Sequence, residues 1–76
     1  PMSVWEQFVS IHAVTSGAFD KIPVSKIKEA QSSLLAKLSK DYTSDMKKLD
    51  KGDKPGDDIL KTIDETTKSV AKAYED

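Results

Sequence analysis

Residues 16–27 read SGAFDKIPVSKI, and this stretch separates two helical patterns. Gly17 accepts the left-handed backbone conformation that commonly follows the last turn of a helix. Pro23 presets the backbone angle of a helix start, where its missing amide costs little. The stretch therefore predicts two helices joined by a short linker.

The segment before the linker, SVWEQFVSIHAVTSG at residues 3–17, predicts the first helix. Ser3 stands three residues before Glu6, which is the spacing of a capping box. Its apolar positions cover more than one stripe, so we expect this helix to be buried on two sides. These positions are Val4, Trp5, Phe8, Val9, Ile11, His12 and Val14.

The segment after the linker carries one narrow apolar stripe at helical spacing. It consists of Val24, Ile27, Ala30, Leu34, Leu35, Leu38, Tyr42, Met46 and Leu49. The sequence SKDYTSD at residues 39–45 has weak helix propensity, so the helix either runs through to Leu49 or breaks near residues 40–45.

Residues 50–56, DKGDKPG, predict a loop, and a last helix is expected over about residues 57–74. Gly56 suits its N-cap, and Asp57 and Asp58 complement the positive end of the helix dipole. The apolar positions of this helix are Ile59, Leu60, Ile63, Val70, Ala73 and Tyr74, with Thr66 and Thr67 in the middle.

These patterns predict an all-α fold, because strand alternation and hairpin turns are missing from the sequence. We expect one domain over residues 1–76: a small bundle of three helices, or of four if the second breaks, with short loops. The expected core is Phe8, Val9, Ile11, Ile27, Leu34, Leu35 and Leu38. Trp5 and residues 1–7 are expected to form a bare face.

Composition excludes several functional classes. A net charge of -1 is too small for a nucleic-acid footprint, and all 12 cations are lysines, so no guanidinium can bind phosphate in a bidentate manner. Cysteine is absent, which excludes a thiolate nucleophile. The longest uncharged stretch, FVSIHAVTSGAF, is too short to cross a bilayer. We therefore expect no nucleic-acid partner and no direct membrane insertion.

Residues with catalytic or ligating potential are few. His12 is the only histidine, and no acidic residue lies three or four positions away, so we expect it at the edge of the core with one hydrogen bond. Asp57–Asp58 and Asp64–Glu65 are adjacent pairs whose side chains point about 100° apart on a helix, so neither pair converges on one site. We expect both on solvated faces.

A calcium loop is also excluded. Counting from Asp50, the EF-hand pattern fails because position 6 is Pro55 and position 12 is Lys61. No glycine-rich phosphate loop occurs either. The sequence thus predicts no catalytic, cofactor-binding or metal-ligating residue, and no enzyme activity for the chain itself.

Three stretches closely resemble the C-terminal domain of the F-type ATP synthase alpha subunit: PMSVWEQ, SIHAVTSGAFDKIPVSKIKE and LLAKL. The matching positions are Pro1, Met2, Gln7, Gly17, Phe19, Asp20, Ile22, Pro23, Lys26 and Ile27. Residues 39–76 match more loosely, through DMKKLDKGDKPGDDILKTI. The chain departs from the family at Ala30 and Gln31, which replace an aromatic residue and Glu. It departs also at His12, where the family often has Tyr, and at Val70 and Tyr74, which replace Phe-rich packing.

The resemblance implies a structural domain of the alpha/beta ring around the central rotor of proton-coupled ATP synthesis. Its partners would be the beta and gamma subunits, while ATP or ADP with Mg would bind a domain that this chain lacks. The location would be peripheral, on the cytoplasmic side of an energy-transducing membrane, in a bacterial plasma membrane rather than an organelle.

Because the chain begins with Pro1, we expect a fragment or processed product, which would self-associate through apolar surface exposed by truncation. The alternative is a free-standing helical adaptor that binds an amphipathic partner helix.

Overall fold

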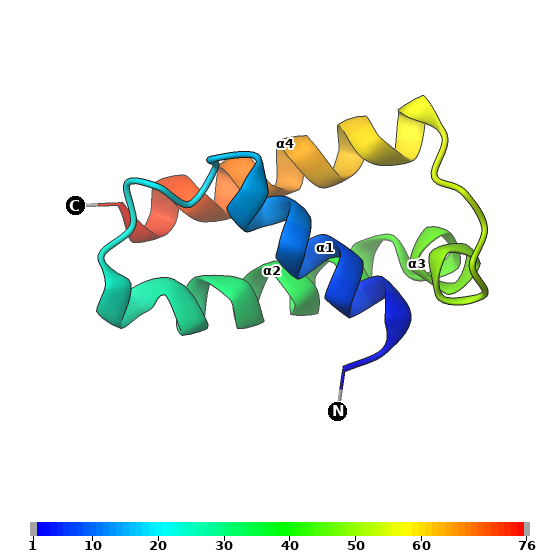
Figure 1. Ribbon diagram of the computed structural model, residues 1–76, viewed down its shortest axis with the longest axis horizontal. Coiled ribbons are helices and arrows are strands. Elements are labelled where there is room, and N and C mark those ends of the chain that lie inside the picture. Colours follow the sequence, from blue (N-terminus) through cyan, green and yellow to red (C-terminus); the bar gives the residue numbers. More distant parts are fainter. Residues whose placement is uncertain (1, 76) are drawn as a thin grey trace.

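The computed structural model describes residues 2–75, which form four α-helices and one 3₁₀ turn and contain no strand. The elements are α1 (Val4–Thr15), η1 (Val24–Lys26), α2 (Ile27–Asp41), α3 (Thr43–Asp50) and α4 (Asp57–Tyr74). In Figure 1, α2 and α4 are two long helices that lie one below the other, and α1 passes obliquely in front of them. The predicted all-α fold is confirmed, in its four-helix form.

The second helical pattern breaks at Tyr42, whose backbone angles, φ -131° and ψ 43°, are not helical. The break falls within the stretch of weak propensity, so a continuous helix to Leu49 is wrong. The axis of α3 turns away from that of α2 (Figure 1), and Met46 and Leu49 both reach the core.

Both ends of α1 follow the local signals in the sequence. The Glu6 carboxylate accepts hydrogen bonds from the Ser3 amide at 2.9 Å and from the Ser3 hydroxyl at 2.8 Å, and the capping box is present. At the other end, Gly17 has φ 82° and its amide donates to the Val14 carbonyl at 3.2 Å. The linker therefore begins where the sequence predicts.

The core lies between α2, α4 and the inner side of α1. Val9, Leu34 and Leu38 are buried as expected, and Ile27 and Leu35 are partly buried against the same cluster. Buried residues that the expected core did not include come from every part of the chain: Ala13, Phe19, Ile22, Ala30, Met46, Leu49, Ile63, Val70 and Ala71. Phe19 and Ile22 belong to the linker, which therefore packs as part of the bundle.

The predicted burial of two core residues is wrong. Phe8 is 36% exposed and Ile11 is 63% exposed. Because α1 crosses the bundle at a slant, only its inner side, with Val9 and Ala13, meets the other helices. Val24 of η1 is also not part of the buried stripe, since it is 90% exposed.

The expected bare face at the N-terminus needs correction as well. Trp5 is partly buried and packs against the core, and its amide donates to the Asp50 carboxylate at 3.3 Å, which ties the start of α1 to the end of α3. Met2 and Val4 are exposed as expected, while Pro1 lies outside the described residues.

The last helix matches its predicted bounds. Thr67 and Val70 are buried and Tyr74 is partly buried, whereas Ala73 is exposed although it was expected on the apolar stripe. The Tyr74 hydroxyl lies 2.7 Å from the Ser33 hydroxyl, which links the end of α4 to α2. Tyr74 thus supplies both packing and a polar contact at this end of the bundle.

Candidate interaction surface

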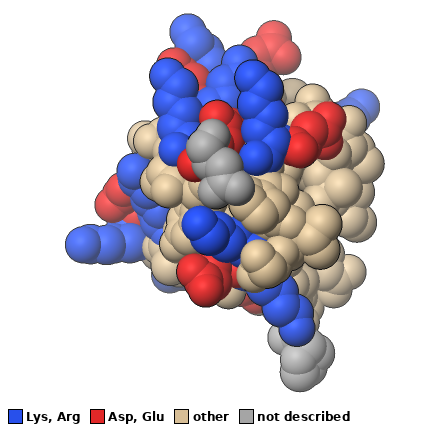
Figure 2. All heavy atoms as spheres, turned by 90° about the vertical axis from the view of Figure 1, so that its left-hand side faces the viewer, with Lys and Arg blue, Asp and Glu red and all other residues tan. Residues whose placement is uncertain are grey.

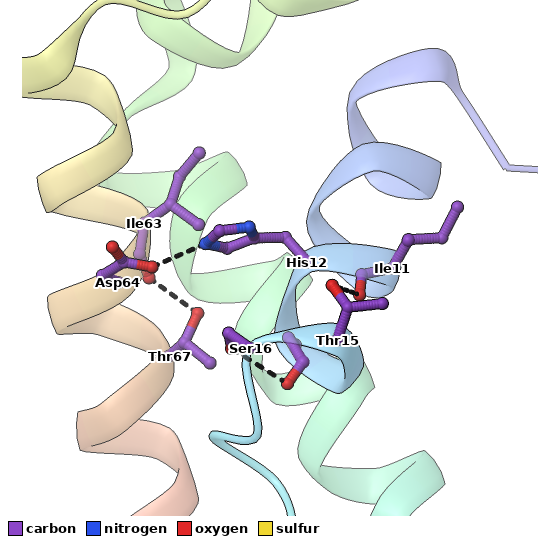
Figure 3. A network of polar contacts seen from close by, with 8 residues as sticks. Ile11, His12, Thr15, Ser16, Ile63, Asp64 and Thr67 are labelled. Atoms are coloured by element: carbon purple, nitrogen blue, oxygen red, sulfur yellow. Dashed lines mark hydrogen bonds and ion pairs between the residues drawn. The ribbon is translucent and has the colours of Figure 1, made fainter.

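His12 is held by a residue that is distant in the sequence. Its Nε2 atom lies 2.6 Å from the Oδ1 atom of Asp64 on α4, and the two side chains are 29% and 46% exposed. Figure 3 shows the imidazole reaching across from α1 to this carboxylate. The expected position at the edge of the core with one hydrogen bond is confirmed. The expectation that Asp64 is only solvated is wrong, because α4 packs beside α1.

The ring of His12 also stacks on Phe8, one helical turn earlier. Their ring centroids are 6.0 Å apart and their planes differ by 11°. This stack fixes the orientation of the imidazole from one side while the carboxylate fixes it from the other. His12 therefore acts as a bridge between α1 and α4.

Among residues 2–75, the hydroxyl groups near the His12–Asp64 pair are not arranged as nucleophiles. The Thr67 hydroxyl donates to the Ile63 carbonyl at 2.6 Å, and the Ser16 hydroxyl donates to a backbone carbonyl of its own helix at 3.3 Å. The Thr15 hydroxyl donates to the Ile11 carbonyl at 2.8 Å, so the three labelled hydroxyls in Figure 3 are all engaged by backbone. A Ser–His–Asp arrangement requires the hydroxyl to donate to the imidazole, which none of the three does.

The other acidic pairs singled out in the sequence lie on the surface. Asp57 and Asp58 are exposed in the first turn of α4, and Glu65 is exposed beside Asp64. Within residues 2–75, no group of three or more His, Cys, Asp or Glu residues could hold a metal ion. The prediction of no metal-ligating residue remains a prediction.

The outward side of α1 is the main uncovered apolar surface. We call Val4, Phe8, Ile11 and Val14 the outer face; all four are exposed. Their spacing of three and four places them on one side of the helix, opposite Val9 and Ala13. Glu6 is the one charged residue of α1, apart from His12 when protonated, and its carboxylate folds back to Ser3. The outer face therefore carries no charge.

A shallow hollow of about 310 Å³ adjoins the outer face, between α1 and α2. It is lined by Ser10, Ile11, Val14, Thr15 and Gln31. The outer face and this hollow together give one side of the molecule both protruding and recessed apolar surface. In Figure 1, α1 lies nearest the viewer and no other element covers it.

Other parts of the surface are highly charged. Figure 2 shows lysine and acidic side chains interspersed over the end of the bundle that contains the end of α4 and the start of α2. Charges of both signs cancel over short distances, which does not favour binding of a polyanion there. None of the helices within residues 2–75 combines the length and apolar character needed to cross a membrane.

Comparison with known proteins places the sequence of the chain in a family. Residues 1–70 match the family described as ATP synthase alpha/beta chain, C terminal domain. The chain belongs to this family. The resemblance noted in the sequence is thereby confirmed, and it extends past the well-matched first half into α4.

Relatives with similar sequences are alpha subunits. The chain is 33% identical to ATP synthase subunit alpha of Streptomyces lividans over 75 residues, which is 99% of the chain and 14% of that relative. The same subunit of Streptomyces avermitilis gives the same identity and coverage, and that of Saccharopolyspora erythraea is 30% identical over 74 residues. The chain thus spans about 14% of the length of its relatives. No solved structure matches it significantly.

Proposed function

We propose that the chain serves as the C-terminal helical domain of an ATP synthase alpha subunit. In this role it packs within the alpha/beta ring around the central rotor and supports proton-coupled ATP synthesis without performing chemistry itself. The observation that carries the proposal is the family match over residues 1–70, together with the alignment of 99% of the chain to alpha subunits. The four-helix bundle is consistent with a packing role.

Nucleotide binding is assigned by this proposal to another part of a longer polypeptide. The sequence supports that division, because it has no arginine and no glycine-rich phosphate loop. Titration of the chain with Mg-ATP up to about 1 mM, followed by calorimetry, tests it. We expect no saturable heat. A saturable isotherm at one site per chain would contradict a purely structural role.

The proposed partners are the beta and gamma subunits, and the proposed location is the cytoplasmic side of a bacterial plasma membrane, as a peripheral part of the complex. The bacterial relatives support this location. The coding sequence that surrounds the chain provides a direct test. We expect it to encode a nucleotide-binding domain upstream in the same reading frame.

A free-standing helical adaptor remains the second candidate, and the uncharged outer face of α1 favours it. An adaptor would be encoded by a reading frame that starts with this bundle. A stop codon in frame shortly before Pro1 would support the adaptor and contradict the alpha-subunit proposal.

A further inference from the structure

The joint between α2 and α3 is a single residue wide. Tyr42 is the one residue between the two helices, and its backbone angles are not helical. Next to it, the Thr43 hydroxyl donates to the Ser39 carbonyl at 2.5 Å. In a continuous helix that carbonyl would accept from the Thr43 amide, and a hydroxyl that takes its place bends the helix. Tyr42 and Thr43 therefore form a hinge between α2 and α3.

The far end of α3 is closed by its own backbone. Gly52 has φ 92°, and its amide donates to the Leu49 carbonyl at 3.0 Å. The Asp53 amide donates to the Lys48 carbonyl at 3.2 Å. These two bonds form a Schellman motif, which ends the helix before the loop to α4 begins. We call residues 43–56, which comprise α3 and this loop, the strap.

Hollows lie on two sides of α3, at the end of the bundle opposite the linker (Figure 1). One of about 160 Å³ lies where α3 meets Trp5 of α1 and Ser39 of α2. The other, of about 670 Å³, separates Asp45 and Lys48 of α3 from the start of α4. The helix packs on α1 and α2 but hardly contacts α4. The strap is therefore less closely packed than the centre of the bundle.

Three side chains of α3 hold the strap in place. Met46 and Leu49 are its buried residues, and the Asp50 carboxylate accepts the solvent-exposed hydrogen bond from the Trp5 amide at 3.3 Å. That carboxylate also lies at the positive end of the α1 dipole. An element with few buried apolar side chains opens at a lower free energy than the rest of a fold.

We propose that the strap opens from the bundle as a unit, hinged at Tyr42 and latched by Asp50 on the Trp5 amide, while α1, α2 and α4 stay folded. Opening exposes the apolar side chains of Met46 and Leu49 together with the side of Trp5 that borders the smaller hollow. The strap thus converts a closed end of the bundle into an apolar surface.

Hydrogen exchange followed by mass spectrometry at low micromolar chain tests the opening. A detached helix of eight residues is marginal in water, so its amides exchange each time the strap opens. We expect protection in α3 at least about tenfold lower than in the buried middle of α2, with a weaker dependence on urea because less surface is exposed. One common protection and one common urea dependence for the two helices would overturn the proposal.

The latch has a matched pair of variants. Asp50 lies in the last turn of α3, where a carboxylate opposes the dipole of that helix, so local propensity alone predicts that Asp50→Ala protects α3. Loss of the latch predicts the reverse, a fall in α3 protection of about three- to tenfold. Asp53→Ala removes the same charge from the loop and should leave α3 unchanged. Unchanged or increased protection in Asp50→Ala would overturn the latch.

Thiol labelling gives an independent measure, because the chain contains no cysteine. Met46→Cys and Leu34→Cys each place one thiol at a buried position, 2% and 0% exposed in the unmodified chain. An aromatic disulfide reagent should modify the thiol at position 46 at least about tenfold faster, since it needs only the strap to open. Equal rates in two variants with native circular dichroism would overturn the proposal. Neither measurement depends on the alpha-subunit assignment, which the nucleotide titration and the reading frame address.

Discussion

Adjacent leucines in α2 offer a sharp test of how the bundle is stabilised. Leu34 of α2 is 0% exposed in the hydrophobic core, whereas the neighbouring Leu35 is only partly buried against that core. Replacing each in turn by alanine removes the same atoms from the same helix, so the change in helix propensity is equal. The two variants therefore differ only in burial and packing.

The expected costs follow from that burial. Leucine-to-alanine changes in a closed core cost about 2–5 kcal/mol, because a cavity remains in addition to the lost apolar contact. We expect about 3 kcal/mol for Leu34→Ala and about 1 kcal/mol for Leu35→Ala, since water can fill the space left at a partly exposed site. A chain of 76 residues has a total stability of about 4–11 kcal/mol, so the first loss is a large share of it.

Urea unfolding followed by circular dichroism at 222 nm and by Trp5 fluorescence measures both costs. A slope near 1 kcal/mol per molar urea, typical of a small domain, converts them to midpoint shifts of about 3 M and about 1 M. Samples must be kept at low micromolar concentration, so that association does not contribute. An equal or greater cost for Leu35→Ala would refute the packing of α2 against α4 described above.

Three further changes probe individual contacts. Gly17→Ala should cost about 1 kcal/mol of stability because the φ angle of Gly17 is 82°, whereas Gly56→Ala, at φ -77°, should cost a few tenths of a kcal/mol. Equal shifts of the melting temperature for the two variants would contradict the left-handed cap. Hydrogen bonds from the Ser3 amide and hydroxyl lower the pKa of Glu6, so its ionised form adds stability that is complete at neutral pH and is lost as pH falls through the lowered pKa. The difference in unfolding free energy between the unmodified chain and Glu6→Gln should therefore shrink from pH 7 toward acid. A difference that stays constant with pH would disprove this contribution. A double-mutant cycle of His12→Ala and Asp64→Ala should give a coupling free energy of about 0.5 kcal/mol, since both side chains are partly exposed. A coupling free energy of zero at every salt concentration would show that the bridge is absent in solution.

Local signals in the sequence were sufficient for both ends of α1 and for the start of α4. The capping box at Ser3, the glycine after α1 and the glycine before α4 each act through bonds within a few residues, so their outcome does not depend on the rest of the fold. The weak propensity around Tyr42 also indicated a break, although it could not decide between a bend and a continuous helix. That choice depends on whether Met46 and Leu49 reach the core, which is a tertiary property.

Long-range packing explains what sequence patterns could not supply. α1 is apolar on two sides, and periodicity alone does not state which side meets the bundle; Phe8 and Ile11 were therefore assigned to the wrong side. Phe19 lies in a linker, where no helical period marks it as buried. The contact between His12 and Asp64 joins residues 52 positions apart, so the sequence within one helical turn of His12 contains no sign of it.

The family assignment came from residue order rather than from physical pattern. A bundle of this composition supports many functions, and the stretch around Gly17 and Pro23 predicts only a helical connection when its chemistry is considered alone. The order of the residues resembles the family, and the chain aligns over 99% of its length with an alpha subunit to which it is 33% identical. Fold and function therefore rest on two separate observations.

Replacement of the matching segment in the Streptomyces lividans alpha subunit by this chain would measure the proposed role most directly. The quantity to determine is the amount of chimeric subunit that co-purifies with the beta and gamma subunits, compared with an alpha subunit from which the segment is deleted. We predict that the chimera is retained in the complex and that the deleted form is not. A soluble, helical chimera that remains outside the complex to the same extent as the deleted form would contradict the assignment of this chain as an alpha-subunit packing domain.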